Sequence, residues 1–193
     1  SGDTGKAALE GYRDVPGVQI AVFYPSHGTS EIQRLQMTTQ EGANVAVYAV
    51  QGNFDDAQTG VKKVFANDAL AKQLDAQGVC LSSANSINWG RLVPQIVYYF
   101  AAYGQLVRSG QARMGQPVDF CVPTGNFGDI LAGYYAKRMG LPVGRLVCAS
   151  NRNDVLTQFL STGVYDAKRP FYKTSSPSMD ILVSSNLERL LYH

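Results

Sequence analysis

The chain has almost no excess of charge of either sign and few residues that bind metal ions. Its 193 residues hold 17 Lys and Arg against 15 Asp and Glu, a formal net charge of +2. The basic residues are scattered, so the sequence does not predict a nucleic-acid-binding surface. There are two histidines, and the three cysteines form no Cys-x-x-Cys pair, so we expect no metal site.

Long hydrophobic runs are also missing. No segment has the length and apolarity that a bilayer span needs, and no basic stretch precedes a signal-like apolar run. Cys80, Cys121 and Cys148 lie far apart inside apolar segments. We therefore expect buried, reduced thiols, no membrane contact and a cytoplasmic protein.

Apolar runs alternate with amphipathic ones along the chain, which is the rhythm of an α/β fold. We expect a three-layer αβα arrangement around a doubly wound, mostly parallel sheet. Ser30 and Gln33 have the spacing of a capping box at a helix start. The expected strands are 18–24, 43–50, 118–122 and 145–149, with a short run at 79–81. The expected helices are 6–12, 30–39, 54–65, 67–77, 89–108, 130–139, 154–160 and 181–191.

Three polar loops are predicted to follow strands, at residues 1–5, 82–88 and 124–129. In a doubly wound sheet, ligands collect at that edge. The third loop is the most informative, because Gly125 and Gly128 permit unusual backbone angles and a helix start offers unpaired N–H groups. We expect it to bind a phosphate.

The second loop holds several Ser and Asn side chains and is followed by Arg91 in the first helical turn. This set suits a small anion, although Ser and Asn also cap helices and form turns without any ligand. Both interpretations stay open from the residues alone.

Two other candidates are set aside. The stretch from Gly2 to Lys6 lacks the glycine spacing of a nucleotide-binding P-loop, and Ala7 stands where a hydroxyl residue would hold magnesium. His27 lies in a Ser-His-Gly sequence at a helix start, which is more typical of a turn than of an acid or base.

Taken together, several motifs resemble the threonine synthases, pyridoxal-phosphate (PLP) enzymes of the tryptophan-synthase-β-like fold, also called fold type II. The resemblance runs nearly end to end. It is carried by Ser1 to Gly5, Glu31 to Gln33, Gln36 to Thr39, Gln51 to Asp56, Ser83 to Asn88, Pro123 to Asp129 and Asn151 to Asp154.

The resemblance implies roles for individual residues. The cofactor-binding residues would be Gly125, Asn126, Phe127, Gly128 and Asp129 around the phosphate, with Asp3 near the ring. The substrate-binding residues would be Ser1, Gly2, Thr4, Asn85, Ser86, Asn88 and Arg91. Many related enzymes have Asn where this chain has Asp3. We infer that Arg91 pairs with the departing phosphate, since a guanidinium suits a dianion.

The resemblance also implies an activity, the conversion of O-phospho-L-homoserine and water to L-threonine and phosphate, the last step of threonine biosynthesis. The family's Schiff-base lysine is expected upstream of Ser1, so no catalytic residue is expected in this chain. Lys6 lies on the wrong side of the motif to replace that lysine. We expect an internal fragment, inactive alone, with residues 1–90 in a smaller βαβ-type domain and 91–193 in part of the larger PLP-binding domain.

Two alternatives remain. One is another fold-type II phospho-lyase or dehydratase that eliminates phosphate and releases a keto acid. The other is a non-catalytic threonine-synthase-like binding domain. The oligomeric state is open, because half-buried apolar faces can be covered by other segments or by a second subunit.

Overall fold

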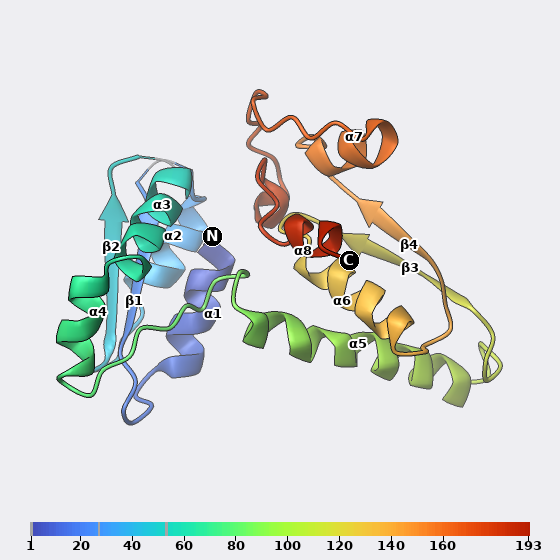
Figure 1. Cartoon of the computed structure of the whole chain (residues 1–193), viewed down its shortest axis with the longest axis horizontal. Coiled ribbons are helices and arrows are strands. Elements are labelled where there is room, and N and C mark those ends of the chain that lie inside the picture. Colours follow the sequence, from blue (N-terminus) through green and yellow to red (C-terminus); the bar gives the residue numbers. More distant parts are fainter. Residues whose placement is uncertain (1, 27, 53) are drawn as a thin grey trace. The chain divides into compact units, whose positions relative to one another are not determined.

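The computed structural model describes residues 2–26, 28–52 and 54–193, and the chain divides into two compact units, Ser1–Ala84 and Asn85–His193. Each unit is built on a pair of parallel strands flanked by helices (Figure 1). The division falls after Ala84 and not after residue 90, so the polar loop at 85–88 belongs to the second unit. The assignment of the two units to domains of a longer enzyme stays a prediction.

The first unit is organised around strands β1 (Ile20–Pro25) and β2 (Val45–Val50). They pair in parallel, with Ile20 opposite Val45 and Pro25 opposite Val50. Its core is small, with buried Leu9, Tyr24 and Met37 surrounded by partly buried valine and isoleucine side chains. The helices are α1 (Gly2–Tyr12), α2 (Glu31–Thr38), α3 (Phe54–Phe65) and α4 (Asp68–Asp75).

Helix α2 begins as the sequence predicts. The Ser30 hydroxyl accepts a hydrogen bond from the Gln33 backbone N–H, and the Gln33 side chain accepts one from the Ser30 N–H, each at 3.2 Å. This reciprocal pair satisfies two donors that a helix start would otherwise leave open. The predicted capping box is therefore confirmed.

The second unit has the larger core. Strands β3 (Val118–Pro123) and β4 (Val143–Ala149) pair in parallel, and α6 (Gly128–Arg138) packs on both strands and on α5 (Trp89–Arg108). Leu92, Leu131 and Val155 are almost fully buried in this core. The chain continues through α7 (Val155–Thr162) and the 3₁₀ turn η1 (Pro177–Met179) to α8 (Leu187–Leu191), which lies against α6 (Figure 1).

Three expectations were wrong in detail. Residues 79–81 form no strand, and Val79 and Leu81 are 47% and 40% exposed, because no neighbouring strand among the described residues pairs with them. The last helix is α8 alone, since 181–186 take an irregular path. Helix α1 begins at Gly2, so Gly2 to Thr4 form its first turn and not a loop.

The cysteines are also less buried than expected. All three are free, and Cys80 and Cys121 are exposed, while Cys148 is half-buried. Over the described ranges, the Cys, His, Asp and Glu side chains form no group of three that could hold a metal ion.

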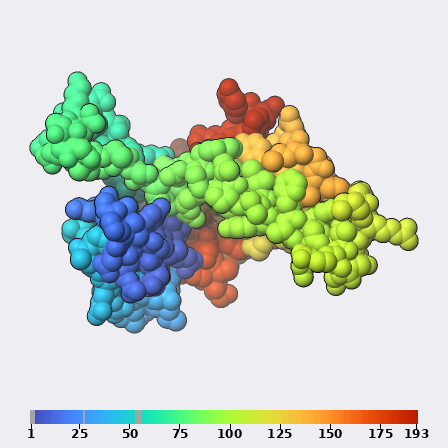
Figure 2. Space-filling view, turned by 90° about the horizontal axis from the view of Figure 1, so that it is seen from below, coloured from blue at the N-terminus to red at the C-terminus, as the bar shows by residue number. Residues whose placement is uncertain are grey.

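The longest helix, α5, leaves much of its apolar surface uncovered. Trp89, Val97 and Tyr98 are each at least half exposed, and the space-filling view shows the surface of α5 in green (Figure 2). Despite this apolar surface, none of the helices in the described ranges combines the length and the apolarity needed to cross a membrane.

Candidate functional site

Strand β3 delivers the third polar loop to the start of α6. The Thr124 backbone N–H donates to the carbonyl of Ala149 on β4 at 2.8 Å, and the buried Thr124 hydroxyl donates back to Val122 at 2.7 Å. Phe127 then turns the chain into the helix with a left-handed φ of 64°, which is uncommon for a residue with a side chain. Its ring is buried in the core, and this burial holds the strained backbone in place.

Three successive carbonyl groups of this loop, those of Gly125, Asn126 and Phe127, accept hydrogen bonds. Gly125 accepts a hydrogen bond from the Ser184 hydroxyl at 2.5 Å, and Asn126 accepts two from Asn186, through its backbone N–H and its side-chain amide, both at 3.1 Å. The Phe127 carbonyl accepts from Leu131 inside α6. In a planar trans peptide the N–H points opposite to the carbonyl, so the N–H groups of residues 126–128 face the other way.

Those N–H groups have no backbone partner. Over the described ranges, no backbone carbonyl accepts a hydrogen bond from the N–H groups of residues 125–130. Three of these residues open an eleven-residue helix, whose first N–H groups carry partial positive charge. The loop and the first turn together therefore present a row of donors with the chemistry that a phosphate requires.

Gly125 has a steric reason to be glycine. A Cβ atom there would lie 3.3 Å from the Ser178 carbonyl oxygen and 3.0 Å from Cδ1 of Ile181. A backbone oxygen cannot easily give way, so a side chain at this position would displace the loop from the segment beside it. The absence of a side chain at Gly125 therefore lets the loop lie directly against Ser178 and Ile181.

Asp129 is the acidic residue of the first turn of α6. The Tyr99 hydroxyl donates to the Asp129 carbonyl at 2.7 Å and approaches its carboxylate oxygen Oδ1 at 3.3 Å. The residue is exposed as a whole, yet the protein atoms around its carboxyl group raise its pKa by desolvation, and the hydrogen bond from Tyr99 opposes that rise. Tyr99 itself is buried, which raises the pKa of its hydroxyl well above the usual range.

The second polar loop closes onto the start of α5. Asn88 is the N-cap, and its Oδ1 atom accepts a hydrogen bond from the Gly90 N–H at 2.8 Å. Arg91 follows in the first turn, and its backbone N–H donates to the Asn88 carbonyl at 3.0 Å. The capping role that Asn permits is therefore realised at Asn88, beside the predicted substrate residues Asn85 and Ser86.

The two loops of the second unit are brought together by residues that sequence reasoning missed. The Asn186 amide nitrogen donates to the Ser86 carbonyl and to the Asn126 carbonyl, each at 3.1 Å. The Ser185 hydroxyl lies 3.1 Å from that of Ser86 and 3.5 Å from Oδ1 of Asn126. A signal was present, because the polar run from Ser184 to Asn186 interrupts an apolar stretch that was predicted to be helical.

The remaining predicted site residues belong to the first unit. Asp3 accepts a hydrogen bond from the Gln33 side chain at 2.9 Å, which ties the first turn of α1 to the capped start of α2. Gly2 and Thr4 lie in the same turn. Ser1 and His27 lie outside the described residues.

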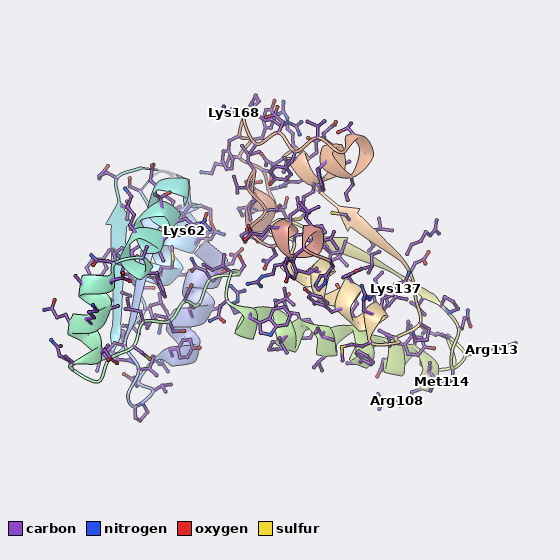
Figure 3. The ribbon with its side chains drawn as sticks, viewed as in Figure 1. Lys62, Arg108, Arg113, Met114, Lys137 and Lys168 are labelled. Carbon is purple, nitrogen blue, oxygen red and sulfur yellow. The ribbon has the colours of Figure 1, made fainter. Side chains whose placement is uncertain are left out.

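The lysines lie on helices or in a surface loop, as the sequence predicted. Lys6 on α1 pairs with Glu10 at 3.1 Å and also donates to Gln40. The other six are exposed, and three of them are labelled in Figure 3: Lys62 on α3, Lys137 on α6 and Lys168 in the loop after α7. These six are Lys62, Lys63, Lys72, Lys137, Lys168 and Lys173.

We compared the chain with known sequences and structures. No protein-family model matches the chain. The fold is α/β with parallel strand pairs and matches part of a fold-type II PLP enzyme. A crystal structure of PLP-bound threonine synthase from Brucella melitensis superposes with a TM-score of 0.80 at 45% identity, covering 98% of this chain and 39% of that one.

Curated protein sequences show the same similarity to threonine synthases. The threonine synthase of Pseudomonas aeruginosa is 51% identical over 192 residues, and human threonine synthase-like 1 is 47% identical over 199, each covering all of this chain. The chain spans 39% of the first protein and 27% of the second. The predicted resemblance to threonine synthases is therefore confirmed along the full length of the chain.

Proposed function

We propose that this chain supplies the cofactor-phosphate site and part of the substrate site of a threonine synthase, a PLP-dependent lyase. The reaction would convert O-phospho-L-homoserine and water to L-threonine and phosphate. The observation that carries the proposal is the row of N–H groups at residues 125–130, together with the carbonyls of residues 125–127, which are bonded to other parts of the second unit. The similarity to threonine synthases along the whole chain supports it.

The residues present fit the phosphate group of PLP. Gly125, Asn126, Phe127 and Gly128 would hold it through backbone donors at the start of α6, with Asp129 behind them. Asp3 would lie near the cofactor ring. When bound, PLP supplies an electron sink that stabilises the negative charge left on carbon after proton removal.

None of the lysines in this chain is proposed as the Schiff-base residue. Lys6 is held by Glu10 and Gln40, Lys137 donates to the Gly144 carbonyl, and the other five are exposed on helices or a surface loop. The chemistry assigned to this chain is binding and orientation.

The substrate side is assigned to Ser1, Gly2, Thr4, Asn85, Ser86, Asn88 and Arg91. Arg91 is the cation of this set, and we propose that it binds the phosphate that leaves the substrate. Substituting Arg91→Gln should raise KM for O-phosphohomoserine by about 10- to 100-fold, because a charged hydrogen bond contributes roughly 1.5–3 kcal/mol.

The matched control is Arg108→Gln at the far end of the same helix, where Arg108 is exposed (Figure 3). It should leave KM unchanged, because it removes the same charge from α5 at a distance from the polar loop. Equal KM values for Arg91→Gln and the unaltered protein would contradict the role of Arg91.

The activity is tested on the natural protein that carries these 193 residues. Purified with PLP and supplied with O-phosphohomoserine, it should release phosphate and threonine in equal amounts, and the 193-residue chain alone should release neither. Activity from the chain alone would contradict the assignment of binding without catalysis. A folded, PLP-loaded protein that forms no product from this substrate would contradict the synthase proposal.

A second function has a specific observation behind it. Human threonine synthase-like 1 is 47% identical to this chain, close to the 51% of the Pseudomonas enzyme, so identity does not separate a synthase from a synthase-like protein. A phospho-lyase built on the same loops would release phosphate and a keto acid without threonine. A non-catalytic binding domain would bind phosphate and form no product.

We also propose that the two units are parts of the smaller and the larger domain of the synthase, and that the protein is cytoplasmic. The compact division after Ala84 and the three free cysteines support these assignments. The partner is a small molecule, with neither nucleic acid nor membrane involved.

A further inference from the structure

One short segment, residues 184–189, makes hydrogen bonds to both polar loops of the second unit. Asn186 is fully buried, with 0% of its surface exposed, and it lies one hundred residues beyond Ser86 in sequence. A fully buried amide needs partners for its nitrogen and its oxygen, since an unmet polar atom is costly. The hydrogen bonds of Asn186 therefore show how residues 184–189 connect the two loops.

The orientation of the Asn186 amide follows from its partners. Arg189 has only donors, and its Nη1 atom lies 3.0 Å from Oδ1 of Asn186. The carbonyls of Ser86 and Asn126 are acceptors, so they must face the amide nitrogen. Both hydrogens of that nitrogen are thus used, one for each loop.

Arg189 extends the same connection. Its Nη2 atom donates to the Ile87 carbonyl at 2.6 Å, and its guanidinium lies 5.6 Å from the centre of the Trp89 ring. One cation thereby fixes the asparagine, the carbonyl of the substrate-side loop and the first residue of α5. A guanidinium can serve all three because its donors form a rigid planar fork.

From these contacts we propose that Asn186 and Arg189 are positioning residues that set the donor row and couple it to the Asn85–Asn88 loop. The hydrogen bond to the Asn126 carbonyl fixes the peptide that carries the Phe127 N–H, so it determines where that donor points. The bonds to the carbonyls of Ser86 and Ile87 hold the substrate-side loop at the same anchor. The inference rests on the proposed function, since it deepens the account of the same site.

The substitution Asn186→Asp tests the proposal. It keeps the size of the side chain and the acceptor for Arg189, but it places a second oxygen against the two carbonyls. The matched control is Asn44→Asp. Asn44 lies in the first unit, and its amide nitrogen donates to the carbonyls of Tyr12 and Val18 at 2.8 and 2.9 Å, so it makes the same kind of contact outside both loops.

The first measurement is the ¹H–¹⁵N spectrum of the folded 193-residue chain without ligand. Asn186→Asp should move the amide signals of both residues 86–88 and residues 125–128, whereas Asn44→Asp should move neither set. If Asn186→Asp changes the amide signals of only one loop, or if the control changes those of both loops, the proposed coupling is wrong. Ser184→Ala, which removes only the bond to Gly125, serves if Asn186→Asp fails to fold, and it should move residues 125–127.

The second measurement is a titration with inorganic phosphate. The unaltered chain should show saturable shifts at residues 125–128, and Asn186→Asp should weaken that binding about tenfold, while Asn44→Asp should stay within about twofold. Unchanged phosphate affinity in Asn186→Asp would overturn the positioning role. No phosphate response in the unaltered chain would instead contradict the proposed function, and the ligand-free spectra would still decide the coupling.

Discussion

Helices α1 and α6 begin in similar sequence, and their glycines serve different purposes. Each starts with glycine and has an aspartate in its first turn, Asp3 in α1 and Asp129 in α6. In α1, a Cβ on Gly5 would lie 2.9 Å from both Met37 Sδ and Val22 Cγ1, so the missing side chain lets the helix pack on β1 and α2. At the start of α6, Gly125 and Gly128 lie on either side of Asn126 and Phe127, and the left-handed backbone of Phe127 makes the turn into the helix.

The comparison shows that glycines near a helix start can serve close packing in one helix and a turn of the chain in another. What distinguishes α6 is that a separate segment binds the loop carbonyls and turns the N–H groups outward. The four predictions that follow test this difference, from the largest expected effect to the smallest.

The largest effect is expected at Phe127. Replacing it with alanine should cost about 3–5 kcal/mol of unfolding free energy, because a buried ring is lost from the core. Phe127→Gly should be more stable than Phe127→Ala by about 1 kcal/mol, because glycine adopts a positive φ without strain. Urea unfolding of both variants measures the difference, and a less stable glycine variant would contradict the strained turn.

The next effect is at α1. Gly5→Ala should destabilise the protein by about 1–3 kcal/mol, because the added methyl group meets Met37 and Val22. Gly11→Ala in the same helix should stabilise it by about 0.5–1 kcal/mol, since a Cβ there has no neighbouring atom among the described residues within 4 Å. If both variants shift the urea midpoint in the same direction, the packing role of Gly5 is wrong.

A smaller effect is expected from Tyr99→Phe. The lost hydroxyl donates to Asp129, so the variant should cost about 1 kcal/mol and raise the pKa of the Asp129 carboxyl group further. Tyr103→Phe on the same helix removes a hydroxyl that donates to the Arg113 carbonyl, and it should leave that pKa alone. An NMR titration of the Asp129 carboxyl carbon separates the two variants. A lower pKa of Asp129 in Tyr99→Phe than in the unaltered protein would contradict the prediction.

The smallest effect concerns pH. Burial raises the pKa of Asp129 in the folded state above its unfolded value of 3.8, so the folded protein holds this proton more tightly. The stabilisation is complete below the unfolded pKa and is lost as pH rises through the folded pKa. The stability of the unaltered chain relative to Asp129→Asn should therefore fall as pH rises from the unfolded value of 3.8 through the folded pKa. An increase of its urea midpoint, relative to that of Asp129→Asn, over this rise in pH would contradict the assigned direction.

The sequence predicted local structure well where side-chain periodicity decides it. Helices α3 and α5 have the predicted bounds, and the Ser30–Gln33 capping box is present, because apolar spacing and caps act over a few residues. The run at 79–81 was misread because its apolar residues fit a strand but no partner strand is present among the described residues. Strand formation depends on such a partner, which sequence spacing does not reveal.

The candidate site, which stays a prediction, depends on local and on distant contacts in the same way. The loop at Gly125–Asp129 follows from glycine spacing between a strand and a helix, whereas Asn186 and Tyr99 are distant in sequence and join the site only through the packed core. Their contribution depends on contacts formed after folding. A polar residue inside an apolar run is the feature that would have directed attention to Asn186.

The hydrogen bonds of Asn186 also affect the order in which the site can form during synthesis. The ribosome produces the Asn85–Asn88 loop about a hundred residues before the asparagine that connects it to the phosphate loop. Closing so long a loop is slow and entropically costly, and domains fold as their chains emerge. A nascent chain that ends before residue 184 can contain both helices α5 and α6 and still lack the bonds to the carbonyls of Gly125 and Asn126, so the proposed phosphate site would form only when the last elements of this region have been made.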